Sequence, residues 1–176
     1  MITWSQDRYG TPDDVHRVDR TVPHPDAGEV LIRMAAVGLN SADVRIMRGE
    51  PLLVRLAFGL RRPKTPVQGR DVAGTVVEVG EGVPAFAVGD RVVGELPAAG
   101  GLAEYVIAPV DRLVAVPDAV DDLTAAALPM AGGTAWQALD AGAVTARSRV
   151  LVLGAGGGVG TFAVRLAVLR GAEVHA

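Results

Sequence analysis

The chain has 176 residues, and its 17 basic and 20 acidic side chains give a formal net charge of −3. This balance excludes an extensive nucleic-acid interface, because Arg61, Arg62 and Lys64 form the only dense basic cluster and it is too short to neutralise a run of phosphates. A hydrophobic content of 49% with 21% charged residues is typical of a globular chain rather than a disordered one.

Cysteine is absent from the chain, which excludes disulfides, thiolate nucleophiles and cysteine-containing zinc sites. No two of the three histidines, His16, His24 and His175, have the spacing of metal ligands. The apolar stretches 150–160 and 162–169 are too short to span a bilayer, and the first residues do not form a signal peptide. We therefore expect a cytoplasmic protein without a membrane partner.

Residues 1 to 120 have the composition of a β-rich domain. Short runs of branched apolar residues alternate there with glycine and proline, a pattern typical of a β-sandwich or barrel. A glycine inside one run, Gly74, indicates a bulge or a close approach between backbones. The predicted strands are residues 29–38, 72–79, 91–93, 103–107 and 113–116.

One helix is expected inside this β-rich region, with Ser41 as its N-cap and Gly49 at its end. Asp43 lies in the first turn, where its charge complements the helix dipole. The next segment, 52–64, has leucines at helical spacing but also Gly59 and two flanking prolines. It is predicted to be a loop with helical content.

Beyond residue 120 the pattern changes to alternating helices and strands. Asp121 or Asp122 is expected to cap a short helix that ends before Pro129. Later in the chain comes an apolar strand, of the kind that is covered on both faces in a parallel sheet. It is followed by a helix with few polar residues, which ends at Gly171. With the start of another strand, these elements predict a βαβ unit. The expected ranges are 133–141 for a second helix, 149–153 for the strand, 159–170 for the covered helix and 172–176 for the last strand.

A glycine-rich turn, Gly-Ala-Gly-Gly-Gly-Val-Gly at residues 154–160, joins that strand to that helix. A dinucleotide-binding turn needs a small residue at the tight turn, a glycine where the backbone approaches the pyrophosphate, and a small residue where the helix packs on the strand. Ala155, Gly157 and Gly160 match these three roles. The helix N-terminus would offer free N–H groups to the phosphates.

The alternative is a tight turn that binds nothing, although a shorter loop with one glycine would suffice for turning. The lysine and hydroxyl residue of a P-loop ATPase do not follow the glycines, which excludes that class. The candidate cofactor-binding residues of the turn are Ala155, Gly156, Gly157, Gly158, Val159 and Gly160.

Five short motifs follow one another along the chain: GLNSAD at 38–43, GRDVAG at 69–74, VGDRV at 88–92, AEY at 103–105 and the glycine turn. Their order and spacing resemble the medium-chain dehydrogenase/reductases over essentially the whole chain. The resemblance implies a β-rich GroES-like barrel as catalytic domain, residues 1–120, followed by the start of an α/β (doubly wound) Rossmann domain, residues 121–176. It also implies that NADP(H) or NAD(H) binds in the cleft between the two domains.

Zinc alcohol dehydrogenases of this family place a cysteine where this chain has Asn40, and a His-Glu pair where it has Arg70 and Asp71. Arg70 cannot replace a metal ligand, because a guanidinium has no lone pair to donate near neutral pH. The chain is therefore similar to the zinc-independent quinone oxidoreductase branch, whose members reduce quinones or activated alkenes with NADPH. This resemblance favours NADP(H) over NAD(H) as the cofactor and implies no metal.

Hydride addition to a conjugated carbonyl leaves negative charge on the carbonyl oxygen, which needs hydrogen-bond donors. Asn40 stands at the family's position beside the nicotinamide, and its amide is expected to donate to the substrate oxygen or to hold the nicotinamide ribose. Asp43 is a second catalytic candidate, with helix capping as its alternative role. Thr134 resembles a family position near the nicotinamide, with a helix N-cap as its alternative. Tyr105 is either a proton donor or part of the barrel core.

Only 16 residues follow Gly160, whereas a complete Rossmann domain needs several further βα units. Two functions remain open. The chain is either the N-terminal portion of an NAD(P)H-dependent quinone or enone oxidoreductase, or a truncated, non-catalytic relative that acts as a binding or assembly module. The incomplete sheet would expose pairing edges, so we expect a homo-oligomer or a second chain to cover it. The apolar segment 52–64 is expected to border the substrate cleft.

Overall fold

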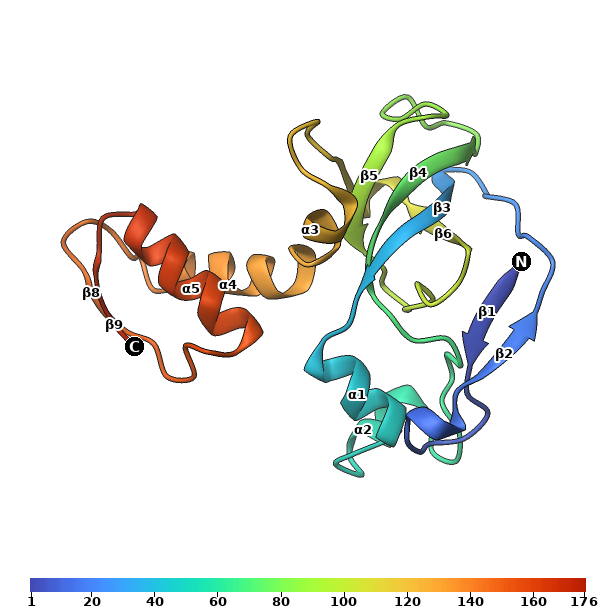
Figure 1. Ribbon diagram of the computed structural model, residues 1–176, viewed down its shortest axis with the longest axis horizontal. Helices are drawn as coiled ribbons and strands as arrows, with labels where there is room; N and C mark the ends of the chain where they lie inside the picture. Colours follow the sequence, from blue (N-terminus) through green and yellow to red (C-terminus); the bar gives the residue numbers. More distant parts are fainter. The chain divides into compact units, whose positions relative to one another are not determined.

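The computed structural model describes residues 1–176 and divides into two compact units, Met1–Ala127 and Leu128–Ala176 (Figure 1). The sequence predicted a domain boundary at residue 120. Helix α3 (Asp122–Ala126) belongs instead to the first unit, because Ala125 and Ala126 are buried against Ala73 and Val93. The first compact unit therefore extends beyond residue 120, to Ala127.

An antiparallel sheet of five strands, in the order β6-β3-β4-β5-β7, forms the centre of the first unit (Figure 1). Successive residues of its strands face opposite sides, so that Val30 and Ile32 lie on the same side, and the apolar set on that side makes the main core. The strands are β3 (Glu29–Gly38), β4 (Asp71–Val79), β5 (Arg91–Glu95), β6 (Tyr105–Pro109) and β7 (Leu113–Ala115), with a short 3-10 turn, η2 (Val110–Arg112), before the last.

The close backbone approach predicted at Gly74 is confirmed. A Cβ atom built on Gly74 would overlap the carbonyl oxygen of Arg33 on the neighbouring strand. The β3–β4 register also shifts between Met34 and Ala36, directly beside this point. Only a residue without a side chain allows the two strands to pass at this distance. Tyr105, at the start of β6, is half-buried within the sheet.

A two-stranded hairpin of β1 (Ile2–Ser5) and β2 (His16–Asp19) was not predicted from the sequence. Its strands are only four residues long and carry several polar side chains, which gives them a weak apolar pattern. A 3-10 turn, η1 (Pro12–Asp14), connects them. Backbone bonds from Trp4 N–H to the Leu102 oxygen (2.8 Å) and from Gln6 N–H to the Pro66 oxygen (2.9 Å) attach β1 to loops of the same unit.

Two helices follow β3 in the first unit. Helix α1 (Ser41–Arg48) has Asn40, not Ser41, as its N-cap, since Asn40 keeps extended backbone angles while Ser41 is already helical. Gly49 ends the helix in a left-handed conformation (φ +63°), as the sequence predicted. Helix α2 (Val54–Phe58) lies within the segment expected to be a loop with helical content.

The second unit contains the predicted βαβ arrangement. Strands β8 (Arg149–Leu151) and β9 (Glu173–His175) pair in parallel, and helix α5 (Gly158–Leu169) connects them. Gly171 follows α5 with φ +81°, and Ala172 donates its N–H to the Ala167 oxygen (3.1 Å), which is a Schellman ending. The expectation of a glycine after this helix is thereby confirmed.

Helix α4 (Pro129–Ala141) begins four residues before its predicted start. The sequence analysis took Pro129 as a helix breaker, but proline is well tolerated in the first turn because the N–H it lacks would have no partner there. Helix α4 packs against α5, where a Cβ on Gly132 would lie 3.8 Å from the Phe162 ring.

The strand and helix around the glycine turn were expected to be covered in a complete sheet and exposed in an incomplete one, and the structure has them exposed. Strand β8 is shorter than predicted, and Leu151, Leu153 and Leu169 are 68%, 86% and 81% exposed. The sheet of this unit has only two strands, too few to bury both faces of an apolar strand. None of the helices combines the length and apolar character that crossing a bilayer requires.

Candidate functional site

The candidate catalytic residue Asn40 lies where β3 leads into α1, and it joins two buried carboxylates. Its side-chain Nδ2 donates to Oδ2 of Asp71 (3.0 Å), and its backbone N–H donates to Oδ2 of Asp43 (2.8 Å). Asp71 starts β4 and pairs with Gly38 in the strand register, so the sheet itself brings Asp71 beside Asn40. The structure therefore unites Asn40 and Asp43, and adds Asp71, which the sequence analysis did not select.

The bond to Asp71 sets the orientation of the Asn40 amide. Because a carboxylate only accepts hydrogen bonds, the nitrogen of the amide must face Asp71. One Nδ2 hydrogen is used in this bond, which leaves the second Nδ2 hydrogen for another acceptor. Asn40 is half-buried, so its amide has the capacity to contact a bound molecule.

Asp43 acts as a helix-capping residue, which was one of its two predicted roles. Oδ2 accepts the Asn40 N–H at the third position of α1, as in a capping box. The other oxygen, Oδ1, is buried without a hydrogen-bond partner. An unpaired buried carboxylate oxygen is costly, and this one borders a pocket.

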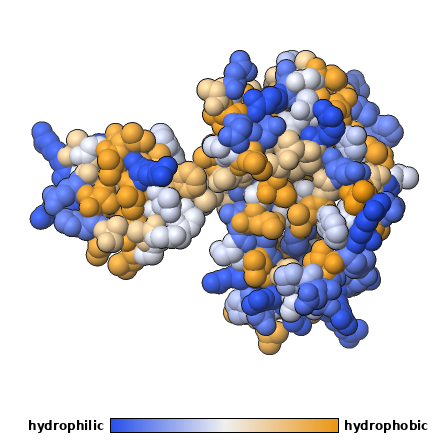
Figure 2. All heavy atoms as spheres, viewed as in Figure 1, coloured by the Kyte–Doolittle hydropathy of each residue, from blue (hydrophilic) through white to orange (hydrophobic).

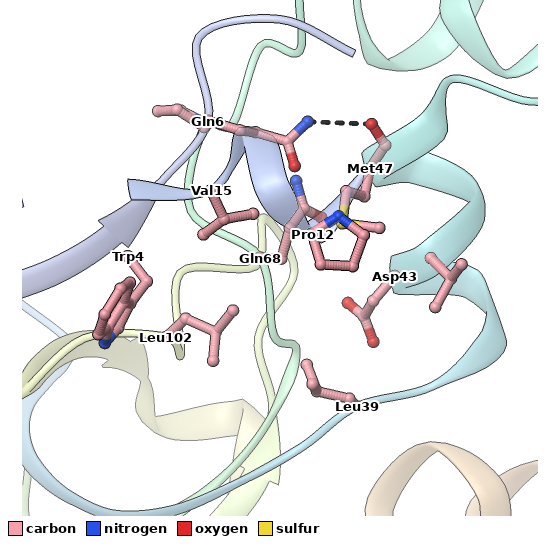
Figure 3. A pocket seen from close by; sticks show the side chains of 11 residues that line it. Trp4, Gln6, Pro12, Val15, Leu39, Asp43, Met47, Gln68 and Leu102 are labelled. Atoms are coloured by element: carbon pink, nitrogen blue, oxygen red, sulfur yellow. Dashed lines mark hydrogen bonds between the residues drawn. The ribbon is translucent and has the colours of Figure 1, made fainter. Parts of the chain in front are cut away.

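A pocket of about 440 Å³ lies beside Asp43, between β1, α1 and the loops at residues 66–68 and 102 (Figure 3). Figure 3 shows the Asp43 carboxylate beside Leu39, at the same pocket as Trp4 and Leu102. The lining is otherwise mostly apolar, which suits a hydrophobic molecule. The apolar lining residues are Trp4, Pro12, Val15, Leu39, Val44, Met47, Pro66 and Leu102.

Two buried glutamines, Gln6 and Gln68, also line this pocket. Nε2 of Gln6 donates to the Met47 oxygen (3.0 Å) and to the Arg8 oxygen (3.1 Å), so its Oε1 is the unpartnered atom. Nε2 of Gln68 points to the Thr65 oxygen (3.4 Å), and its Oε1 is unpartnered too. Together with Asp43, three residues that line the pocket therefore each have one buried acceptor oxygen without a donor.

The glycine turn of the second unit has the shape that a phosphate-binding turn requires. Gly154 makes the sharp turn with φ +77°, so Gly154 takes the role that the sequence analysis gave to Ala155. A Cβ on Gly160 would overlap the Gly154 oxygen and lie 2.7 Å from Ala155 Cα. Gly160 is therefore the position of close helix packing, as predicted.

The middle of the turn is open and offers amide donors. A Cβ on Gly156 would meet no atom within 4 Å, and one on Gly157 would meet only the Gly154 oxygen at 3.3 Å. The N–H groups of Gly158 and Val159, in the first turn of α5, have no acceptor. Space next to free N–H groups at a helix start suits a phosphate.

Comparisons with known proteins identify the family. Residues 26–118 match the model of the alcohol dehydrogenase GroES-like domain. A chloroplast envelope quinone oxidoreductase homolog of Arabidopsis thaliana is 41% identical over 170 residues, which cover 92% of this chain and 50% of the relative. The solved quinone oxidoreductase of Coxiella burnetii superposes with a TM-score of 0.90 at 31% identity, over 99% of this chain and 55% of that one.

The chain belongs to the quinone oxidoreductase-like medium-chain dehydrogenase/reductases. Human quinone oxidoreductase is 36% identical over 172 residues, covering 94% of this chain and 49% of the relative. The chain thus spans about half the length of the curated relatives it matches. The GroES-like part of the predicted fold is shown by the family match, which lies inside the first unit.

At the positions that bind zinc in some members of this family, the residues of this chain form an ion pair and hydrogen bonds with other protein groups. Arg70 forms an ion pair with Glu95 (3.4 Å) and donates to the Pro97 oxygen (2.7 Å). Asn40 and Asp71 are joined by the hydrogen bond described above. No group of three histidine, aspartate or glutamate side chains comes together to hold a metal ion, and this donor set does not fit one.

Thr134 lies inside α4, six positions after its N-cap Leu128, and is exposed. The alternative role of helix N-cap is therefore wrong, because α4 starts earlier than predicted. A Cβ on Gly158 would lie 3.8 Å from the Ala131 side chain, so the first turn of α4 lies beside the glycine turn. The proximity of Thr134 to a nicotinamide stays a prediction.

Sequence reasoning missed Asp71, Gln6 and Gln68. Asp71 had a signal in the sequence, since it occupies a motif position next to Arg70 and directly precedes the strand predicted at 72–79. Gln6 had none, because its role depends on a hairpin that the sequence did not predict. Gln68 directly precedes the second motif, but only the fold brings it to the pocket.

Proposed function

We propose that this chain is the N-terminal portion of a metal-free NAD(P)H-dependent oxidoreductase that transfers hydride to a quinone or an activated alkene. The observation that carries the proposal is the open glycine turn with unpartnered N–H groups at the start of α5. The names of relatives support the reaction class, among them a 2-methylene-furan-3-one reductase of Solanum lycopersicum, 36% identical, and the CurK enoyl reductase, TM-score 0.90.

The second unit would be the start of a Rossmann domain. The backbone N–H groups of Gly158 and Val159 would bind the cofactor phosphates, and the open space at Gly156 and Gly157 would admit them. The cofactor supplies the hydride when it is bound. NADP(H) is favoured over NAD(H), and a mycobacterial relative with a TM-score of 0.83 was solved with NADPH.

Asn40 would act on the substrate. The Nδ2 hydrogen that is not given to Asp71 would donate to the carbonyl oxygen of the acceptor, where negative charge develops. Asp71 would serve as a positioning residue, because its carboxylate determines which way the amide faces. The apolar pocket beside Asp43 would hold the hydrophobic part of a quinone or enone.

Cofactor binding tests the proposal directly. Titration of the chain with NADPH, followed by nicotinamide fluorescence, should show saturable binding that the Gly156→Leu variant abolishes. A Cβ atom at this position would meet no atom within 4 Å, so the fold should be retained while the rest of the side chain fills the open turn. Ala141→Leu places the same side chain on the exposed end of α4 and is the control. Unchanged NADPH affinity in Gly156→Leu would contradict the assignment of the turn.

The alternative function is a binding or assembly module without catalysis. The exposed leucines on β8, after it and at the end of α5 favour it, because an apolar surface of this kind suits a partner. A chain that binds no nicotinamide cofactor, reduces no acceptor and forms a defined oligomer would support this alternative. Turnover of phenanthrenequinone with NADPH, unaffected by a chelator, would support the oxidoreductase instead.

A further inference from the structure

Residues 51–70 differ in charge from the rest of the chain. They contain five of the 17 basic residues and none of the 20 acidic ones, although the whole chain is negatively charged. Two exposed arginines of α1, Arg45 and Arg48, precede this stretch, and α1 contacts α2. The stretch from α1 to residue 70 therefore carries more basic than acidic residues, while the protein as a whole is acidic.

The same segment exposes four large apolar side chains. Leu52, Leu53, Leu56 and Leu60 are 71%, 73%, 66% and 68% exposed. A single exposed leucine needs no explanation, but four within nine residues form an apolar patch that indicates a binding surface. In Figure 2, hydrophobic and hydrophilic side chains are interleaved over the lower part of the larger unit, where Figure 1 places α1 and α2.

The backbone of this segment is held in place, so the exposure of the leucines is part of the folded structure. The Tyr9 hydroxyl donates to the Gly59 oxygen (2.5 Å), and Lys64 N–H donates to the Phe58 oxygen (2.7 Å). Arg55 donates to the Gly49 oxygen (3.1 Å) and stacks over the Tyr9 ring at 4.6 Å. Pro63 is buried beneath the segment.

Two of the cations have no partner in the protein. Arg61 and Arg62 are exposed and make no ion pair or side-chain hydrogen bond, whereas Arg55 is engaged with Gly49 and Tyr9. Lys64 is exposed and donates from Nζ to the Ala57 oxygen (3.1 Å). The surface therefore presents free guanidinium groups next to Leu60.

We propose that residues 52–64, the leucine–arginine segment, dock on the surface of an anionic lipid bilayer. The leucines would enter the boundary between headgroups and acyl chains, and Arg61, Arg62 and Lys64 would bind lipid phosphates. A bilayer surface offers apolar and anionic layers at adjacent depths, which matches this mixture. A nucleic acid offers phosphates but no apolar layer for the four leucines.

This docking needs no membrane-spanning helix, and the segment, which was expected to border the substrate cleft, contributes no residue to the pocket beside Asp43. The sequence-based expectation of no membrane partner rested on the length of apolar stretches, which tests spanning only. A surface contact requires exposed apolar side chains with flanking basic residues, and its strength grows with the number of charges.

Vesicle flotation of the full chain tests the role of the charges. The chain should bind vesicles of phosphatidylcholine with phosphatidylglycerol, bind pure phosphatidylcholine weakly, and lose binding as salt rises. Arg61→Gln with Arg62→Gln should weaken binding about 25-fold, at about fivefold per charge. The control variant, Arg147→Gln with Arg149→Gln, removes two exposed arginines of the second unit. It has the same net charge as the first double variant and should bind vesicles as the parent chain does.

Insertion of the leucines is tested by a single label, because the chain has no cysteine of its own. An environment-sensitive dye on Leu53→Cys should shift to the blue on phosphatidylglycerol vesicles, and the same dye on Leu123→Cys, an exposed leucine of α3, should not. The proposal is overturned by no vesicle binding, by equal losses in the two arginine variants, by an unshifted dye at Leu53, or by binding to duplex DNA in place of vesicles.

Discussion

At the scale of single residues, the orientation of the Asn40 amide has the greatest chemical consequence. An asparagine at a helix N-cap normally accepts a hydrogen bond from the first turn. Here its nitrogen is committed to Asp71, and Asp43 receives the Asn40 backbone N–H. The side-chain amide of Asn40 thus faces a buried carboxylate, and one of its two hydrogens is left for a ligand.

Replacement of Asn40 should reduce the rate of hydride transfer. In an active preparation we expect Asn40→Ala to lower kcat/KM for phenanthrenequinone about 100-fold, because one donor to the developing oxyanion is removed. NADPH affinity measured by fluorescence should change little. Ser41→Ala, at the exposed first position of α1, is the control and should keep full activity. An Asn40→Ala enzyme with undiminished kcat/KM would remove Asn40 from the mechanism.

Two glycines of the second unit should respond to alanine in opposite ways. Gly160→Ala should destabilise the fold by about 1–3 kcal/mol, since its Cβ would overlap the Gly154 oxygen. Gly133→Ala should stabilise it by about 0.5–1 kcal/mol, because this position is helical and has no atom within 4 Å. Urea unfolding of both variants against the parent chain measures the two shifts, and the same sign for both would contradict the packing described.

At the scale of elements, the two longest strands were predicted more closely than the start of α4. Strand β3 was predicted with both ends correct and β4 to within one residue, because alternation of apolar residues is a local signal. Helices α1 and α4 begin at residues that the sequence analysis misassigned. The start of a helix depends on which of several neighbouring residues caps it, and that choice is made by contacts elsewhere, such as Asp71 for α1.

Helix α3 has a charged cap whose effect should depend on pH. Hydrogen bonds from the Thr124 backbone N–H (2.9 Å) and hydroxyl (2.7 Å) hold the pKa of Asp121 below its usual value. A lowered pKa in the folded state contributes stability that is present above the pKa of the unfolded chain and lost as pH falls through the folded pKa. We expect the melting temperature of the parent chain to fall more steeply below about pH 5 than that of Asp121→Asn.

Thermal unfolding followed by circular dichroism over this acid range makes the comparison. Asp118→Asn, which removes an exposed acid just before the helix, is the control and should reproduce the parent's pH dependence. Parallel curves for the parent and Asp121→Asn would show that the cap does not contribute.

At the scale of the whole molecule, the two units differ in how completely they bury their apolar residues. The first has a continuous core of strand residues, whereas the second leaves Leu151, Leu153 and Leu169 largely exposed. The family match, residues 26–118, lies within the first unit and ends before the second. An apolar surface of this kind should favour association.

Sedimentation velocity should therefore detect association of the chain through the second unit. Leu151→Gln with Leu153→Gln should shift the population toward the monomer, because the apolar area that drives association is reduced. Leu123→Gln makes the same change at an exposed site of the first unit and should leave the distribution as it was. A parent chain that is monomeric at every concentration would remove the basis for a covering partner.

The amino-acid sequence by itself determined the strands of the five-stranded sheet in the first unit, the βαβ order of the second, the glycine turn and the resemblance to one family. These features follow from the spacing of residues that are close together in the sequence, so they can be predicted without knowing which distant residues are in contact. Only the tertiary structure decided that Gly154 makes the sharp turn, that Asp71 orients Asn40 across 31 positions of sequence, and that Gln6, Asp43 and Gln68 share one pocket. The register of β3 against β4 and the docking of the β1 hairpin create these neighbours, because strand pairing joins residues that no local pattern connects.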